Sequence, residues 1–444
     1  MRRAVILLVV FALVDLVRPL GSSGYGAQAL LAFGFLVLAA YTVGEIAKSI
    51  HAPAIVGYMA AGVIFGPVGL EALSHETVVR LQPVSALAVA LIAFLAGAEL
   101  RWEEVRERWA ALLKVTGTEL ALSALALGLT LFLAGPYIPF LRDATTVELV
   151  AVAVLVASIA IVHSPAVTMA LLTETRAHGP VARTTLGVVL ISDVVVVMLF
   201  SGALALVRSL VPVSGAAGPG VLAIVWEISG ALIVGGVLGA GIALYLRFVA
   251  EELFLFALLV AFLGAEVARL THVETLLTLL TAGFIAENFS PPARGQALRH
   301  AMERSAAPVF VVFFALSGAE IDVMTVVRLL PLLVPLALVR VGAIWAGTRL
   351  GGRWAHLPQE ERRWLWMGLV SQAGVAIGLA AIVAEVFPGF GEGLRSMLLA
   401  LIALNESVGA VLFRRALVAS GEYVPGAAAT PEPDDSRLSA PGSS

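Results

Sequence analysis

Apolar stretches of the length that crosses a membrane recur along almost the entire chain. A helix needs about 20 mostly apolar residues to span ~30 Å of hydrocarbon. The sequence predicts fourteen spans, at residues 4–18, 28–48, 53–70, 83–99, 109–134, 147–173, 183–207, 221–246, 251–269, 273–288, 305–322, 328–349, 363–386 and 395–415. Lipid admits only helices and closed barrels, and the alternating pattern of barrel strands is missing. The sequence therefore predicts an all-α polytopic membrane protein.

The composition excludes several other classes of protein. Hydrophobic residues make up 60% of the chain and charged residues 13%, whereas a soluble domain is about half apolar and a quarter charged. The chain has no cysteine, which excludes disulfides and thiolate chemistry. Its net charge is −3 and it has no long basic run, so we expect no nucleic-acid partner.

The placement of Lys and Arg predicts the orientation in the membrane. With the N-terminus in the cytoplasm, nineteen Lys and Arg residues fall on the cytoplasmic side and seven on the opposite side. A bias of this kind in short loops is typical of cytoplasmic faces. We therefore expect a multi-pass protein of the cell membrane (inner or plasma membrane), with both termini cytoplasmic.

The two ends of the chain differ from the part between them. Residues 1–27 are predicted to hold a retained extra span rather than a cleaved signal peptide, because Asp15 interrupts the apolar run and no clear cleavage site follows. Residues 423–444 are rich in Pro, Ser, Ala and acids, which predicts a disordered cytoplasmic tail. Residues 28–422 are expected to form one membrane domain.

Two of the predicted spans contain residues that break helices. Span 147–173 contains His163-Ser164-Pro165, and span 363–386 contains Ser371 and Gln372 followed by Ala-Gly. Proline removes a backbone hydrogen bond in mid-span, and polar neighbours can satisfy the freed groups. The two segments lie seven spans apart and so cross in opposite directions, which predicts an inverted repeat with two discontinuous, crossing helices. Its halves are residues 28–207 and 251–417, linked by span 221–246.

Three ionisable residues are predicted near mid-membrane, namely Asp193, Arg340 and Glu406. A charge at this depth costs at least ~2.5 kcal/mol on insertion scales, so it is expected to be functional or paired. Asp193 is the strongest candidate, because a buried carboxylate can carry a proton or bind a small cation, and the two compete. The alternative is a carboxylate that forms a structural salt bridge in a packed bundle.

The other candidates surround these three charges. Arg340 stays charged, so it is expected to need Asp193 or Glu406 as a partner, either as a counter-charge or as a structural pair. Oxygen and imidazole groups suited to an alkali cation or a proton come from Ser192, Ser164, Thr168 and His163. Polar side chains at and after the second break come from Ser371, Gln372 and Asn405.

Several segments resemble, in order, those of a known family. They are Val56–Pro67, with Gly-Tyr-x-x-Ala before Gly-Pro, Leu95–Leu100, with Gly-x-Glu-Leu, and Phe313–Asp322, with Phe-Phe and a final Ile-Asp. Together with the breaks and Asp193, residues 28–417 resemble the monovalent cation:proton antiporter superfamily. The likeness is greatest to its second family, which includes sodium/proton antiporters and potassium-efflux systems.

The resemblance implies a transporter with a panel domain and a core domain, an elevator-like movement and a homodimer. Asp193 matches the family's essential ion- and proton-binding acid, and Arg340 matches the basic residue before the second broken helix. The transported ions would be Na⁺ in first place, or K⁺ or Li⁺, and H⁺, with no cofactor. Ser192 stands where relatives place a second acid or an asparagine, so one-for-one, electroneutral exchange is expected unless Glu406 also titrates.

Other functions remain open at this stage. An organic-anion or other ion transporter of the same fold is the first alternative, because helix N-termini at a break attract anions. A proton-uncoupled potassium efflux system is the second. A channel is less favoured because no selectivity-filter motif is present, and an enzyme because no nucleophile–base set or metal motif is found.

Overall fold

The computed structural model describes residues 25–211, 221–248, 253–372, 374–387 and 389–423. These residues are nearly all helical and include no strand, which confirms the predicted all-α class. The predicted first span, 4–18, lies outside the described residues, as does the predicted tail apart from Tyr423.

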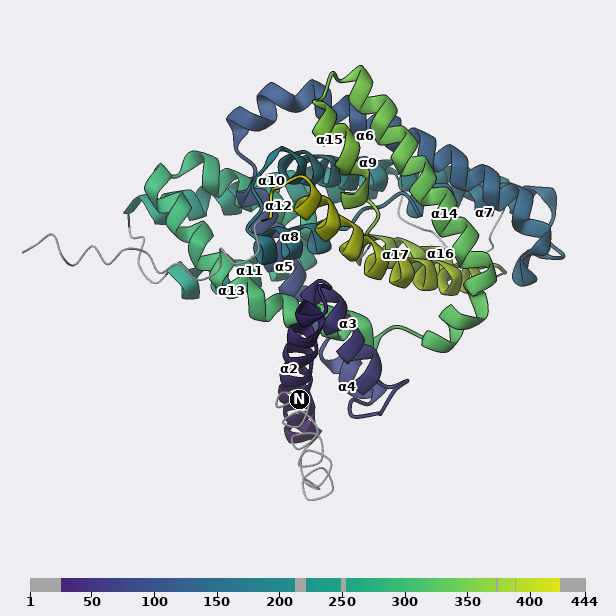
Figure 1. Cartoon of the computed structure of the whole chain (residues 1–444), viewed down its shortest axis with the longest axis horizontal. Coiled ribbons are helices and arrows are strands. Elements are labelled where there is room, and N and C mark those ends of the chain that lie inside the picture. Colours follow the sequence, from purple (N-terminus) through teal and green to yellow (C-terminus); the bar gives the residue numbers. More distant parts are fainter. Residues whose placement is uncertain (1–24, 212–220, 249–252, 373, 388, 424–444) are drawn as a thin grey trace, which may run out of the picture.

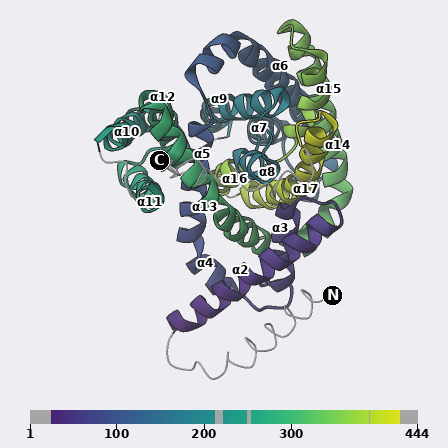
Figure 2. The same cartoon turned by 60° about the vertical axis from the view of Figure 1, so that its left-hand side comes forward.

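Two groups of helices make up the molecule (Figures 1 and 2). We call the first the core group: α6 (Trp102–Ala134), α7 (Thr146–Ile159), α9 (Pro180–Leu210), α14 (Val323–Trp354), α15 (Gln359–Gly368), α16 (Gly374–Val386) and α17 (Gly391–Ala419). The second, the panel group, holds α2 (Tyr25–Ser49), α3 (Ala54–Phe65), α5 (Gln82–Ala98), α10 (Val221–Phe248), α11 (Leu253–Thr271), α12 (Thr275–Phe289) and α13 (Pro292–Ala319). Helix α8 (Pro165–Thr175) contacts both groups, and the short α4 (His75–Arg80) lies beside α2 and α5.

The number of spans is not settled by helix length alone. Within the described residues, five helices are long and apolar enough to cross a membrane: Arg106–Tyr137, Pro180–Leu210, Trp226–Phe248, Val323–Trp354 and Gly391–Ala419. Several more helices are apolar but shorter, as expected where a break divides a span into two shorter helices. The count of fourteen spans stays a prediction.

Glycines bring the two longest core helices into backbone contact. A Cβ atom at Gly347 of α14 would lie 2.6 Å from the Cα of Glu119 in α6, and one at Gly351 would lie 2.8 Å from the Cα of Val115. Small residues at this i, i+4 spacing allow membrane helices to pack closely. The α6–α14 contact therefore brings Glu119 into the neighbourhood of Arg340, two turns before Gly347 in α14.

Both predicted helix breaks are present. Helix α7 ends at Ile159 and α8 begins at Pro165, while α15 ends at Gly368 and α16 begins at Gly374. At the first break the Ser164 hydroxyl accepts a hydrogen bond from the Val167 N–H at 3.1 Å, and Pro165 occupies the first helical position. Proline is favoured there because its missing N–H would have no helical partner. On each side of α10 the interrupted pair of helices is followed by one long helix, α9 (Pro180–Leu210) on the first side and α17 (Gly391–Ala419) on the second, but the exact repeat boundaries, 28–207 and 251–417, stay a proposal.

Candidate functional site

Arg340 joins the two interrupted helices. Its side chain is fully buried. Nε donates to the carbonyl of Ala160 at 2.7 Å and Nη2 to that of Val162 at 2.9 Å, both in the first break. Nη1 donates to the carbonyl of Val370 in the second break, with Leu369 at 3.5 Å from Nη2. The carbonyl ends of helices carry partial negative charge, so α7 and α15 both present favourable ends to the guanidinium.

The expected partner of Arg340 was therefore wrong. We predicted an ion pair with Asp193 or Glu406, and the structure gives the guanidinium backbone carbonyls instead. The physical reason is that two unwound helix ends supply several unpaired carbonyls at one point, and an arginine has five donors in a fixed fork to satisfy them.

His163 cross-links the same two breaks to α6. Its Nδ1 lies 2.7 Å from the carbonyl oxygen of Leu369, and its Nε2 lies 3.0 Å from Oε2 of Glu119. Ser123 donates to the other oxygen of Glu119 at 2.7 Å. A carbonyl only accepts, so Nδ1 must carry a hydrogen, and the Nε2–Oε2 contact then needs one further proton between the two groups. All three side chains are buried, so this proton is held away from solvent.

The polar residues after the second break continue the network. The Gln372 amide donates to the carbonyl of Ala160 at 2.8 Å, and the Asn405 amide donates to the Gln372 oxygen at 2.7 Å. Ala160 thus receives hydrogen bonds from both Arg340 and Gln372. The structure brings these predicted residues together, and their geometry is that of a framework that fixes the two breaks relative to each other.

Asp193 stands apart from this framework. It lies on α9 with 6% of its surface exposed, and neither of its carboxyl oxygens accepts a hydrogen bond from any described residue. Buried polar groups are almost always paired, so each exception needs an explanation. A carboxyl group in this position is suited to hold a proton or a cation.

The neighbouring hydroxyls bond within their own helices. Ser192 donates to the Val189 carbonyl at 2.7 Å, and Thr168 donates to that of Ser164 at 2.9 Å. Each hydroxyl oxygen still has lone pairs with which it can accept a hydrogen bond or contact a cation. The geometry leaves the predicted ligand role of these residues open.

Glu406 and Ser371 form a second, smaller unpaired group near the second break. Glu406 is 2% exposed and Ser371 is 2% exposed, and Oε1 of Glu406 and Oγ of Ser371 have no hydrogen-bond partner among the described residues. Ser371 lies directly against Gly409 of α17, where an added Cβ would be 2.3 Å from its Oγ. Glu406 is therefore a buried acid without the arginine partner that we predicted for it.

A cavity of about 420 Å³ lies between the core group and the panel group, and its lining on α9 begins at Val197, one helical turn after Asp193. From the core group and α8 it is lined by residues that include Pro165, Val197, Ser201 and Gly378, and from the panel group by residues that include Phe313. Val197 follows Asp193 by one helical turn, and Ser201 follows by two, so Asp193 lies on the α9 face that borders the cavity.

Two further acids line this cavity from the panel side. Glu227 belongs to α10, and Glu274 precedes α12, where its carboxylate accepts a hydrogen bond from the Leu277 N–H. The Glu274 backbone N–H also donates to the Glu227 carbonyl at 3.4 Å.

Sequence reasoning missed three of these acids. Glu119 lies within predicted span 109–134, where its cost in lipid should have singled it out in the same way as Asp193. Glu227 and Glu274 lie near predicted span ends, and an acid near a span end gives no signal by itself because it can reach water.

Two interrupted helices that meet at depth beside buried ionisable groups are the architecture of secondary ion transporters. The family model described as the transmembrane part of the sodium/hydrogen exchangers matches residues 33–414. The chain therefore belongs to the sodium/hydrogen exchanger family, a family of multi-pass membrane transporters, which confirms the resemblance found in the sequence.

The fold is similar to that of a solved antiporter. The structure of the sodium proton antiporter MjNhaP1 from Methanocaldococcus jannaschii at pH 8 matches with a TM-score of 0.64 and 15% sequence identity, over 89% of this chain and 98% of that one. At this identity the likeness establishes the fold. No curated protein matches the chain.

Proposed function

We propose that this chain is a secondary active antiporter that exchanges a monovalent cation for H⁺, with Na⁺ as the first candidate and K⁺ or Li⁺ as the others. The observation that carries the proposal is Asp193, a buried carboxyl group that accepts no hydrogen bond from the described residues and lies one helical turn from the cavity-lining Val197. Burial disfavours a bare carboxylate, so the group binds either a proton or a cation, and one excludes the other.

The helix breaks support this role for Asp193. Pro165, the first residue of α8, and Val375, the second residue of α16, line the cavity, so the positive N-terminal ends of both half-helices face it. Arg340 binds the carbonyl ends of the other two half-helices, α7 and α15, which carry partial negative charge. We infer that Arg340 holds the breaks in place while Asp193 exchanges its ligands.

The residues on α9 support one-for-one, electroneutral exchange. Ser192 occupies the position before Asp193, and its hydroxyl donates to its own helix. Asp193 is then the single titratable group at this level of α9. Glu406 is the residue that could add a second proton, because it is buried on α17 and one of its oxygens is unpaired.

Alternating access would come from movement of the core group against the panel group. The cavity-lining residues Leu204 and Glu274 lie near the span ends that the Lys and Arg bias assigns to the non-cytoplasmic side. We therefore propose that this conformation is open to the outside. We also propose a homodimer in the cell membrane with both termini cytoplasmic and no cofactor, since the cargo ions complete the chemistry.

The test is ion exchange by the purified chain in liposomes that contain a pH-sensitive dye. Addition of Na⁺, K⁺ or Li⁺ is expected to change the internal pH, and Asp193→Asn is expected to reduce this change to that of protein-free liposomes. Asp143→Asn is the matched control, because Asp143 is an exposed loop residue and the chemical change is the same. A cation-dependent pH change that survives in Asp193→Asn would contradict the proposal.

The stoichiometry has its own test. Clamping the membrane potential at zero or at a large value should leave the rate of electroneutral exchange unchanged. A rate that follows the potential would show that net charge moves. In that case Glu406→Gln should abolish the dependence if Glu406 carries the additional proton.

A further inference from the structure

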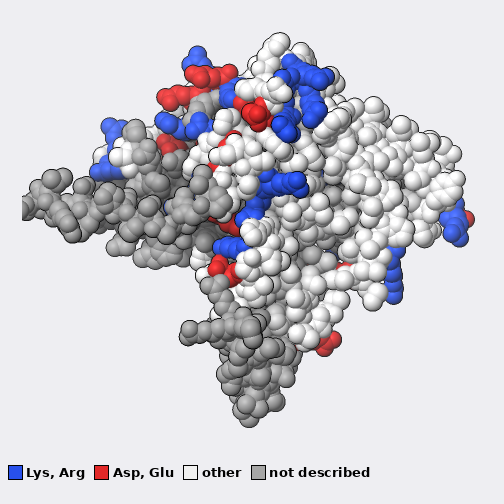
Figure 3. Space-filling view, in the orientation of Figure 1, with Lys and Arg blue, Asp and Glu red and all other residues white. Residues whose placement is uncertain are grey.

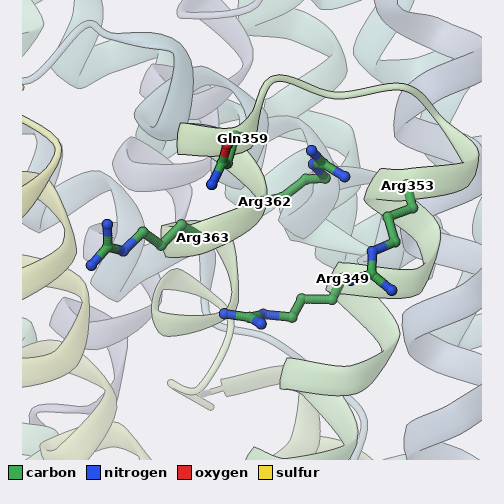
Figure 4. A pocket seen from close by; sticks show the side chains of 5 residues that line it. All are labelled: Arg349, Arg353, Gln359, Arg362 and Arg363. Carbon is green, nitrogen blue, oxygen red and sulfur yellow. The ribbon is translucent and has the colours of Figure 1, made fainter.

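A second hollow, of about 560 Å³, lies at the turn between α14 and α15. Its lining residues differ in chemistry from those of the cavity near Asp193. Its lining is almost entirely basic: Arg349, Arg353, Gln359, Arg362 and Arg363. We call it the arginine hollow. Arg349 and Arg353 come from the last turns of α14, and the other three residues come from the first turns of α15 (Figure 4).

Helical spacing places these side chains on two facing stripes. Arg349 and Arg353 are four residues apart on α14, while Gln359, Arg362 and Arg363 occupy positions i, i+3 and i+4 on α15, and each set shares one face of its helix. The helices approach closely at Gly352, where an added Cβ would lie 2.8 Å from Cγ of Arg362. The turn of the backbone therefore brings side chains from two helices to line one hollow, although they are separated in the sequence.

These guanidinium groups lack acidic partners. In the described part of the chain, no carboxylate forms an ion pair with any of the four arginines, and the buried Nε of Arg362 has no hydrogen-bond partner. Of the two acids in the first turn of α15, Glu361 is already bound by Arg108 at 2.9 Å and by the Thr184 hydroxyl at 2.5 Å, and Glu360 accepts a hydrogen bond from Nε1 of Trp364 at 3.2 Å. The four arginines thus line one hollow without an ion-pair partner among the described residues.

Aromatic rings hold two of the arginines without neutralising them. The Arg349 guanidinium lies 4.6 Å from the ring centroid of Trp345, and that of Arg363 lies 4.8 Å from that of Trp364. A cation–π contact orders the side chain and leaves its N–H groups available to an anion. Trp345 is 43% exposed and Trp354 62% exposed, and exposed Trp side chains are typical of the headgroup level of a membrane.

We propose that the arginine hollow binds an anion that carries two phosphate groups. Arginine forms bidentate hydrogen bonds with phosphate oxygens, and two pairs of arginines on facing helices match two such groups. The first turn of α15 has no side-chain cap, so its N–H groups add to the positive field. Figure 3 shows blue side chains gathered at the end of the molecule where these two helices meet. The ligand is either the headgroup of an anionic lipid or a soluble polyphosphate, and the tryptophans favour the lipid.

The test measures binding to the full-length chain in a neutral detergent, with one arm for each source. Native mass spectrometry with added cardiolipin reports the lipid, with phosphatidylcholine, a zwitterionic lipid without net charge, as the comparison. Calorimetric titration with inorganic pyrophosphate reports the soluble anion. We expect Arg349→Gln with Arg362→Gln to weaken binding at least about tenfold, because two charge-assisted contacts are lost.

Matched variants keep the outcome unambiguous. Arg101→Gln with Arg106→Gln removes the same charge from an exposed segment of the same predicted side and should leave binding unchanged. Arg349→Lys with Arg362→Lys keeps the charge and the fold, and should still weaken binding because the bidentate geometry is lost. Loss of only one arm in the Gln variant identifies the source. Binding of neither probe by the unmodified chain, or an equal loss in the exposed control, would overturn the proposal. None of these readouts depends on ion exchange, so failure here leaves the proposed antiport untouched.

Discussion

Arg340 and Asp193 are two buried ionisable residues in the same core group, and their side chains differ in their hydrogen bonds. Arg340 donates to carbonyls at both helix breaks and lies in a network with Gln372, while its neighbour His163 is tied to Glu119. Both oxygens of Asp193 are left without a partner among the described residues. A buried charged group whose hydrogen bonds are all made stabilises the structure, whereas one without hydrogen-bond partners is available to bind a ligand.

This difference gives Arg340 a structural role and Asp193 a role in transport within one site. The breaks create free carbonyls and free N–H groups at mid-depth, and the fixed arginine binds the carbonyl ends. The N-terminal ends face the cavity beside Asp193. If this division is correct, variants of the arginine network should damage stability, and variants of the unpaired acid should damage exchange alone.

The largest expected effect comes from Arg340→Met. The substitution leaves the carbonyls of Ala160, Val162 and Val370 buried without donors, so we expect a loss of about 3–5 kcal/mol in the free energy of unfolding. Chemical unfolding of the purified protein in micelles measures this loss. Arg340→Lys should recover part of it, because an ammonium group has three donors and reaches fewer carbonyls. Unchanged stability in Arg340→Met would break the comparison.

Much of this arrangement could be predicted from the sequence because lipid penalises charges and broken helices. Asp193 and Arg340 were found through the cost of a charge in a span, and the two breaks through Pro165 and the Ser-Gln-Ala-Gly segment. The partner of Arg340 could not be predicted, because backbone carbonyls leave no signature in the residue types. Their availability depends on where each helix ends in space.

The arginine hollow is a second feature that could not be predicted from the residue types. In the sequence, Arg349, Arg353, Arg362 and Arg363 count only as positive charges on one side of the membrane. Their convergence depends on the α14–α15 turn and on the close approach at Gly352. Glu119 is a different case, because its position within predicted span 109–134 is itself a signal in the sequence.

The second prediction tests the shared proton of His163 and Glu119. Glu119→Leu leaves Nε2 of His163 and the hydroxyl of Ser123 without their partner, which should cost about 1–3 kcal/mol of unfolding free energy. Glu119→Gln is the control, since its amide can donate to Nε2 and its oxygen can accept from Ser123. We expect the Gln variant to stay within about 1 kcal/mol of the parent. Equal losses in the two variants would show that the contact does not stabilise the breaks.

A smaller effect is expected at the exposed start of α14, the helix that carries Arg340. Asp322 caps this helix, and the Thr325 hydroxyl, at 2.6 Å, and the Thr325 N–H, at 3.1 Å, lower the pKa of its carboxyl group. Because the folded-state pKa is lowered, the cap stabilises fully above the ordinary value of 3.8 and is lost as the pH falls through the folded-state value. Asp322→Ala should cost about 1 kcal/mol at pH 7. Unfolding measured at pH 7 and pH 3 should show the difference between variant and parent shrink.

The smallest effect on stability, and the sharpest contrast with Arg340, is expected for Asp193→Asn. The substitution removes no hydrogen bond seen among the described residues, and it replaces a buried ionisable group with a neutral amide of the same shape. Relief from burying a charge offsets the cost of an amide with few partners, so we expect the free energy of unfolding to change by less than about 1 kcal/mol. The same variant should have no cation-dependent pH change in liposomes. A large loss of stability would instead mean that Asp193 is a structural residue like Arg340. The proposed division between a hydrogen-bonded structural arginine and an unpaired ion-binding acid would then be wrong.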